Sequence, residues 1–179
     1  MLLASLVLAA CHAAAQDDPD QASRPRSFQP RSGRVTYGGS FGFGIGSDGW
    51  GASLRGELGY LATDRLWVGA SGRFQWSHDE WYGDSYDAFD YGVGAWGRYF
   101  VFDRVFASTE WDWTSYEVPT SPSTSGRESF SSLLVGAGYG QPLGSRSVFL
   151  VEVLCDVTGN VNGVYGTPWV TRLSFATGF

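Results

Sequence analysis

Large apolar residues alternate with small or polar residues along most of the chain after residue 34. In the segment 35–46 every second position holds Val35, Tyr37, Gly39, Phe41, Phe43 or Ile45, and the positions between hold glycine, serine or threonine. Since successive side chains of a β-strand point to opposite faces, this pattern predicts a strand with one apolar face. The segment is longer than the roughly five or six residues of an average strand, which favours a barrel over a sandwich.

The same alternation returns in seven more segments, so the chain is predicted to form eight antiparallel strands. The further segments are 50–60, 66–76, 89–99, 105–114, 132–139, 149–158 and 169–179. Tight turns are expected at 47–49, 63–65 and 101–104 and at Pro142 with Gly144, and longer loops at 77–88, 117–129 and 159–166. Connections that alternate in this way between short and long are typical of outer-membrane barrels.

Charged residues within these segments fall on the face opposite the large apolar residues. They are Arg55, Glu57, Arg73, Asp90, Arg98, Glu110, Asp112, Glu152, Asp156 and Arg172. A soluble barrel with these charges outside is the alternative, but it would crowd rings such as Trp76 and Trp111 into an eight-stranded interior that barely holds ordinary side chains. We therefore expect an up-and-down transmembrane barrel with aromatic belts in lipid and a polar, charge-paired interior, where Gly38 and Gly136 leave room.

Composition narrows the classes of function. The chain has 179 residues, a net charge of -6 and 12 basic residues, all of them arginine, so a nucleic-acid partner is not expected. Aromatic residues make up 16% of the chain and glycine occurs 25 times, which favours strands. The sequence contains no apolar run of the roughly 18 residues that a transmembrane helix needs, so a membrane span would have to be built from strands.

The chain before the first strand is predicted to be a targeting segment and a linker. Residues 1–15 are expected to be a signal peptide, because the apolar run Leu2–Ala10 precedes three alanines, although no basic residue comes before it. The alternative is that Leu8–Cys11, which resembles a lipoprotein processing box, directs acylation of the cysteine. Residues 16–34 are rich in Asp, Pro and Arg and predict a disordered periplasmic leader, which leaves 35–179 as the barrel.

Strand number, loop pattern and the final segment together carry a resemblance to a known family. The chain resembles the small eight-stranded outer-membrane proteins, the class that includes outer-membrane protein X and the barrel half of outer-membrane protein A. Its last strand places Leu173, Phe175 and Phe179 on one face, similar to the signal that the barrel-assembly machinery reads, with Thr177 where an apolar residue is usual. The resemblance implies a monomer in a Gram-negative outer membrane, surrounded by lipid and lipopolysaccharide and inserted by that machinery.

The interior charges are the first candidates for function. Buried charges need partners, so Arg55, Arg73, Arg98 and Arg172 are expected to pair with Glu57, Glu110, Asp112, Glu152 and Asp156. The preferred interpretation of this network is a structural plug. The alternative is a porin-like narrow path for small solutes, because rings of charged groups also line selective pores.

Catalysis is not expected, and neither a metal nor a cofactor is predicted. Some barrels of this size modify lipid A with a histidine, a serine and a carboxylate, and Ser77 and His78 lie near a strand end. Neighbouring residues of an extended chain point to opposite faces, so these two do not form a nucleophile–base pair, and a solvated loop histidine is expected. Cys155 is expected to be a packing residue.

Binding at the surface is the remaining class of function. The aromatic and acidic segment around Trp81, Tyr82, Tyr86 and Asp87, and the polar segment 121–126, are candidates for contact with an extracellular ligand. Aromatic side chains at this level also anchor a barrel in lipid headgroups, and the sequence leaves both interpretations open. The hypothesis that best fits the whole sequence is an envelope-structural or surface-interaction role.

Overall fold

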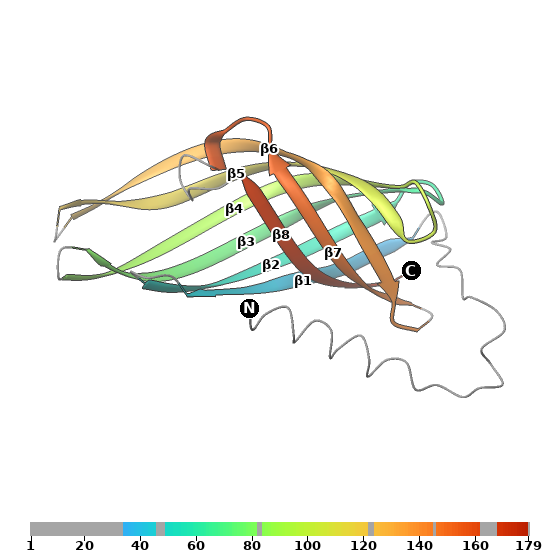
Figure 1. The fold of residues 1–179 in the computed structure, drawn as a ribbon, viewed down its shortest axis with the longest axis horizontal. Coiled ribbons are helices and arrows are strands. Elements are labelled where there is room, and N and C mark those ends of the chain that lie inside the picture. Colours follow the sequence, from blue (N-terminus) through green and yellow to red (C-terminus); the bar gives the residue numbers. More distant parts are fainter. Residues whose placement is uncertain are drawn as a thin grey trace.

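Eight strands form a closed antiparallel barrel, as the sequence predicts. The computed structural model describes residues 34–45, 49–81, 84–121, 124–144, 146–161 and 168–178. Each strand pairs with the next along the chain, and β8 pairs with β1 to close the barrel (Figure 1). The strands are β1 (Val35–Ile45), β2 (Gly49–Leu61), β3 (Leu66–Trp81), β4 (Asp84–Phe100), β5 (Val105–Ser121), β6 (Thr124–Pro142), β7 (Ser147–Asp156) and β8 (Trp169–Thr177).

The start of β1 and the end of β8 meet at one end of the barrel, here called the terminal end. Three predicted tight turns lie there, between β2 and β3, β4 and β5, and β6 and β7. In the first of them the Thr63 hydroxyl accepts hydrogen bonds from the backbone N–H groups of Arg65 and Leu66. In the third, Gly144 has a φ of 94°, a left-handed conformation that glycine adopts without steric cost. These three short turns are therefore confirmed.

At the opposite end, here called the hairpin end, the structure has strands where the sequence predicted loops. Residues 77–81 and 84–88 continue β3 and β4, and residues 117–121 and 124–129 continue β5 and β6, where loops were expected. A hairpin with two solvated faces needs no apolar face, so polar composition alone does not separate such a hairpin from a loop. Cross-strand contacts support it, since the Tyr116 ring meets Phe130 edge-on and its hydroxyl donates to Glu128.

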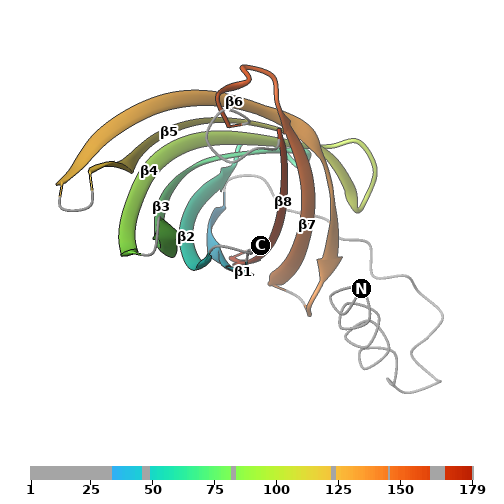
Figure 2. The same ribbon diagram turned by 60° about the vertical axis from the view of Figure 1, so that its left-hand side comes forward.

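Strand lengths make the barrel asymmetric. Strands β3 to β6 extend at the hairpin end beyond β1, β2, β7 and β8, so that two hairpins project from one side (Figures 1 and 2). The strand pairing shows the same asymmetry. Strands β4 and β5 pair only from Tyr91↔Ser115 to Phe100↔Phe106, on the side of the terminal end. From Tyr91 towards the hairpin end, the β3–β4 hairpin and the β5–β6 hairpin are no longer paired with each other.

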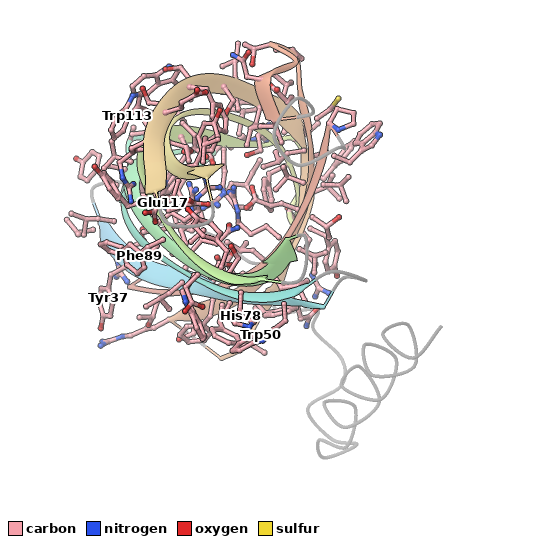
Figure 3. The ribbon with its side chains drawn as sticks, turned by 90° about the vertical axis from the view of Figure 1, so that its left-hand side faces the viewer. Tyr37, Trp50, His78, Phe89, Trp113 and Glu117 are labelled. Atoms are coloured by element: carbon pink, nitrogen blue, oxygen red, sulfur yellow. The ribbon has the colours of Figure 1, made fainter. Side chains whose placement is uncertain are left out.

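The outer surface of the barrel is apolar and the lumen is polar, as predicted. Phe41 is 69% exposed and Leu54 61%, whereas Arg98 and Glu152 are fully buried. Figure 3 looks along the barrel from the hairpin end, with Tyr37, Trp50 and Trp113 at its circumference and nitrogen-bearing side chains in its middle. Exposed rings form two belts: Tyr37, Tyr60, Tyr99 and Tyr139 towards the terminal end, and Trp50, Trp76, Tyr91, Trp111 and Trp169 towards the hairpin end.

Some predictions lie outside the described residues. They are the signal peptide 1–15 with its alternative processing site, the leader 16–34 apart from Arg34, residues 47–48 of the first predicted turn, Tyr82, residues 122–123 and 162–166 of two predicted loops, and Phe179. Of the described part of the chain, no helix is long and apolar enough to cross a membrane.

Candidate functional site in the barrel lumen

A layer of apolar side chains fills the lumen at the terminal end. Trp67 and Trp96 meet edge to face with ring centroids 5.0 Å apart, and Trp67 Nε1 donates to Thr36 Oγ1 over 2.7 Å. The layer was not predicted from the sequence, although in strands β3, β4 and β5 alternation places Trp67, Trp96 and Phe106 on the same face as the charged residues. The large rings of this layer are buried against one another. The layer consists of Leu61, Trp67, Trp96, Phe100, Phe106, Val148, Leu150 and Ala176.

Arg98 begins the charged layer that lies directly on these rings. Its guanidinium stands over the faces of Trp96 and Trp67, 4.3 and 4.9 Å from the ring centroids. It binds Glu152 with two hydrogen bonds of 3.0 and 2.7 Å and donates to Glu57 over 2.9 Å. Both carboxylates are buried, so Arg98 joins β2, β4 and β7 through paired, desolvated charges.

Arg172 and Arg55 complete the charged layer. Arg172 of β8 donates two hydrogen bonds, of 2.7 and 2.9 Å, to Glu110 of β5 across the width of the barrel. Arg55 of β2 lies 2.9 Å from the same Glu110 and 3.1 Å from Glu57, and its Nη1 is 3.4 Å from Asp112. Because carboxylates are shared between arginines, the three guanidiniums form one network that spans the lumen.

Two residues of the predicted network have other partners. Arg73 was expected to pair with a carboxylate, but it donates to Thr114 Oγ1 over 2.8 Å, and no ion pair is found for it among the described residues. Asp156 was expected to pair with an arginine, but it accepts hydrogen bonds from the backbone N–H groups of Thr158 and Val161. Asp156 lies at the end of β7, where the chain turns, so its carboxylate caps the turn instead of reaching across the lumen.

A second apolar cluster covers one side of the lumen at the hairpin end. Val161, from the segment after β7, packs with Leu134 and Leu154, and Phe130 and Val170 lie against them. Asp156 holds this segment in place through the hydrogen bond from the Val161 N–H, 2.8 Å long. Along β6 and β7, the charged layer therefore lies between two apolar clusters, one towards the terminal end and one towards the hairpin end.

A clamp of polar contacts holds the two projecting hairpins together where β4 and β5 separate. Glu117 accepts a hydrogen bond from the Phe89 N–H over 3.1 Å, and its own N–H donates to Asp90 over 3.0 Å. Arg127 of β6 donates to the Phe89 carbonyl over 2.7 Å and lies 4.8 Å from the Tyr91 ring centroid. Side chains thus replace the missing backbone ladder between β4 and β5, and the labelled Phe89 and Glu117 mark the place in Figure 3.

His78 was expected in a loop, but it lies on a strand and has a partner, and its side chain remains partly exposed. It lies in β3 opposite Asp87 of β4, with 2.8 Å between His78 Nδ1 and Asp87 Oδ1. Its ring is 6.3 Å from that of Trp50, near the belt at the hairpin end (Figure 3). Ser77, the neighbouring hydroxyl, is on the opposite face of the strand, as expected. The Asp87 carboxylate therefore orients the His78 imidazole, and Ser77 does not face this pair.

The described residues contain no group of three or more His, Cys, Asp or Glu side chains arranged to hold a metal ion. Cys155 has a free thiol and is half-buried.

Comparisons with known proteins find similarity in structure only. No protein-family profile matches the sequence, and no curated protein matches it. The chain is similar to the N-terminal β-barrel domain of Pseudomonas aeruginosa OprF, with 11% identity and a TM-score of 0.49 over 84% of this chain and 100% of that one. It is also similar to the Yersinia pestis outer membrane protein Ail, with 16% identity and a TM-score of 0.49 over 83% of this chain and 100% of that one.

Proposed function

We propose that this protein is a monomeric barrel of the bacterial outer membrane that does not conduct solutes or catalyse a reaction, and that presents its projecting hairpins to the cell exterior. The observation that carries the membrane placement is the inverted barrel, with exposed apolar side chains outside and buried ion pairs inside. Only a closed barrel satisfies all backbone groups with strands in hydrocarbon. The two aromatic belts mark the levels of the lipid headgroups.

The lumen supports a sealed barrel over a porin-like path. A water-filled route would have to pass the Trp67–Trp96 layer and then the Arg98 and Arg172 ion pairs, which bridge opposite strands. Rings of charge that conduct ions leave the centre open, whereas here the guanidiniums and carboxylates bond to each other across it. The network therefore serves to hold the barrel wall together.

The projecting hairpins support a role at the surface. Strands β3 to β6 continue past the outer aromatic belt, and the clamp of Glu117, Asp90 and Arg127 fixes the two hairpins relative to each other. Ordered segments that extend from a rigid scaffold are suited to contact with extracellular ligands.

Three measurements, two on cells and one on the purified protein, test the proposal. Cell fractionation should place the protein in the outer membrane, and the purified protein in a planar lipid bilayer should give no conductance steps. Protease added to intact cells should cut within the projecting hairpins and leave the barrel whole. Regular conductance steps would instead support the porin-like alternative, and a change in lipid A mass on expression would support the enzyme.

A further inference from the structure

The two ends of the barrel differ in charge. Among the described residues before β1 and in the three short turns of the terminal end, arginines outnumber carboxylates: they are Arg34, Arg65, Arg104 and Arg146, with Asp64 and Asp103. At the hairpin end, by contrast, the described side chains include Arg127 and the carboxylates Asp87, Asp90, Glu117 and Glu128. The terminal end therefore attracts anions, and the hairpin end does not.

Arg104 lies on the outer face of the barrel, at the level of the tyrosine belt. Its Nη1 donates to the Tyr139 hydroxyl over 3.1 Å and to Gln141 Oε1 over 3.4 Å. The Tyr139 hydroxyl in turn donates to Gln141 Oε1 over 3.3 Å, and both residues are exposed on β6. These three side chains, here called the Arg104 cluster, form one polar group on the surface that faces the bilayer.

The Arg104 cluster has hydrogen-bond donors to spare and no acidic group of its own. No ion pair is found for Arg104 among the described residues, and its hydrogen bonds there use Nη1 alone. Its Nε–H and Nη2–H groups therefore remain for a ligand, and the amide nitrogen of Gln141 stands beside them. Parallel N–H groups of a guanidinium match the oxygens of a phosphate.

Two exposed apolar side chains lie in the turns next to the Arg104 cluster. Phe102, in the turn before β5, is 71% exposed, and Leu143, in the turn after β6, is 47% exposed. These turns are neighbours, because β5 and β6 are adjacent and the Gly140 N–H donates to the Arg104 carbonyl over 2.7 Å. Apolar side chains beside an arginine fit the boundary between lipid headgroups and acyl chains, where both kinds of group are satisfied.

We propose that the Arg104 cluster binds the headgroup phosphate of an anionic phospholipid in the leaflet that faces the periplasm, an inference that rests on the membrane placement proposed above. The phosphate accepts hydrogen bonds from Arg104 and from the Gln141 amide. The acyl chains lie along the outer faces of β5 and β6, where Val105 and Val135 are exposed. The excess of arginines at this end disfavours a headgroup that carries an ammonium group, so a net negative headgroup is selected.

Native mass spectrometry of the full chain in detergent tests this site. Phosphatidylglycerol and phosphatidylcholine with the same acyl chains are added together in equal amounts, and the protein should retain phosphatidylglycerol in preference. Glycerol phosphate, added at the same concentration as the lipids, should not displace it, because the free headgroup lacks the acyl chains that bury apolar surface. Equal retention of the two lipids would overturn the site, and displacement by glycerol phosphate would show a site for a free phosphate instead.

Matched variants separate a local site from a general attraction of charge. Arg104→Gln should lower the ratio of bound phosphatidylglycerol to phosphatidylcholine about fivefold, the effect of one arginine near an anionic lipid. Tyr139→Phe, which removes a hydroxyl that positions Arg104, should lower it about threefold. Arg65→Gln and Tyr99→Phe are the controls, since both residues lie at the same end of the barrel and neither bonds to the Arg104 cluster in the described structure.

The controls should keep a ratio close to that of the unchanged protein. An unchanged ratio in Arg104→Gln, or an equal loss in Arg65→Gln, would overturn the site in favour of diffuse charge. All four substitutions are outside the lumen, so heat-modifiable gel mobility should show a folded barrel in each. The proposed function is tested separately by fractionation and conductance, and a protein of the outer membrane without this lipid preference would contradict the site alone.

Discussion

Arg98 is the residue on which the lumen depends most, because it contacts both the apolar layer and two buried carboxylates. Replacing it with glutamine leaves Glu57 and Glu152 without their main partner. Removal of one member of a buried ion pair costs about 3–5 kcal/mol, so Arg98→Gln should lower the free energy of unfolding by that amount. Urea unfolding in detergent micelles, followed by the loss of heat-modifiable gel mobility, measures it.

Arg65→Gln is the control for Arg98→Gln, since Arg65 is an exposed arginine in the turn between β2 and β3. It removes the same charge without touching the lumen and should leave the unfolding midpoint almost unchanged. Equal midpoints for the two variants would show that the network does not hold the barrel together.

Glycine on the inner face gives a second prediction at the residue scale. A Cβ atom at Gly138 would collide with the Phe106 ring and approach the Val151 carbonyl, whereas one at Gly56 would meet nothing within 4 Å. Gly138→Ala should therefore destabilise the barrel by about 1–3 kcal/mol through overpacking, and Gly56→Ala should not. Thermal unfolding of the two variants side by side checks the difference, and a destabilised Gly56→Ala would contradict it.

Which charged residues face inwards could be predicted from the sequence, but their partners could not. Alternation alone placed Arg98 and Glu152 on the inner face, and both are buried there. Their pairing depends on which strands oppose each other across the closed barrel, and a period-two pattern contains no information on that. The same limit explains why Arg73 and Asp156 were assigned to the network although they bond to Thr114 and to the turn after β7.

At the scale of elements, the clamp at the base of the projecting hairpins is predicted to keep them ordered. Arg127→Gln removes the bond to the Phe89 carbonyl and the contact with the Tyr91 ring. Chymotrypsin should then cut the β5–β6 hairpin faster, because local opening becomes more frequent. The unfolding midpoint of the barrel should stay the same. An unchanged cleavage rate would mean that the clamp is dispensable.

The projecting hairpins are the part of the strand pattern that could not be predicted from the sequence. Strand number, direction and the short turns followed from apolar alternation and turn residues. The outer halves of β3 to β6 did not, because outside a membrane neither face of a hairpin must be apolar and the alternation is lost. The apolar layer at the terminal end consists of inward positions such as Trp67 and Phe106, but a period-two pattern does not show that these side chains meet in one layer.

For the molecule as a whole, the account depends on the orientation of the two strand faces. Apolar residues such as Leu54 and Val135 are 61% and 44% exposed on the outside, while Ser132 is 2% exposed inside. If the barrel spans a bilayer, the outward positions meet lipid chains over a belt about 25 Å tall. A soluble barrel of the same topology would place them in water.

The most direct test is spin labelling of single cysteines at these three positions, in a protein with Cys11 and Cys155 replaced by alanine and reconstituted into lipid bilayers. Labels at Leu54 and Val135 should collide readily with oxygen, which concentrates in hydrocarbon, and rarely with a water-soluble nickel complex. A label at Ser132 should be immobile and shielded from both. Nickel-accessible labels at Leu54 and Val135 would contradict the membrane barrel and the functions proposed from it.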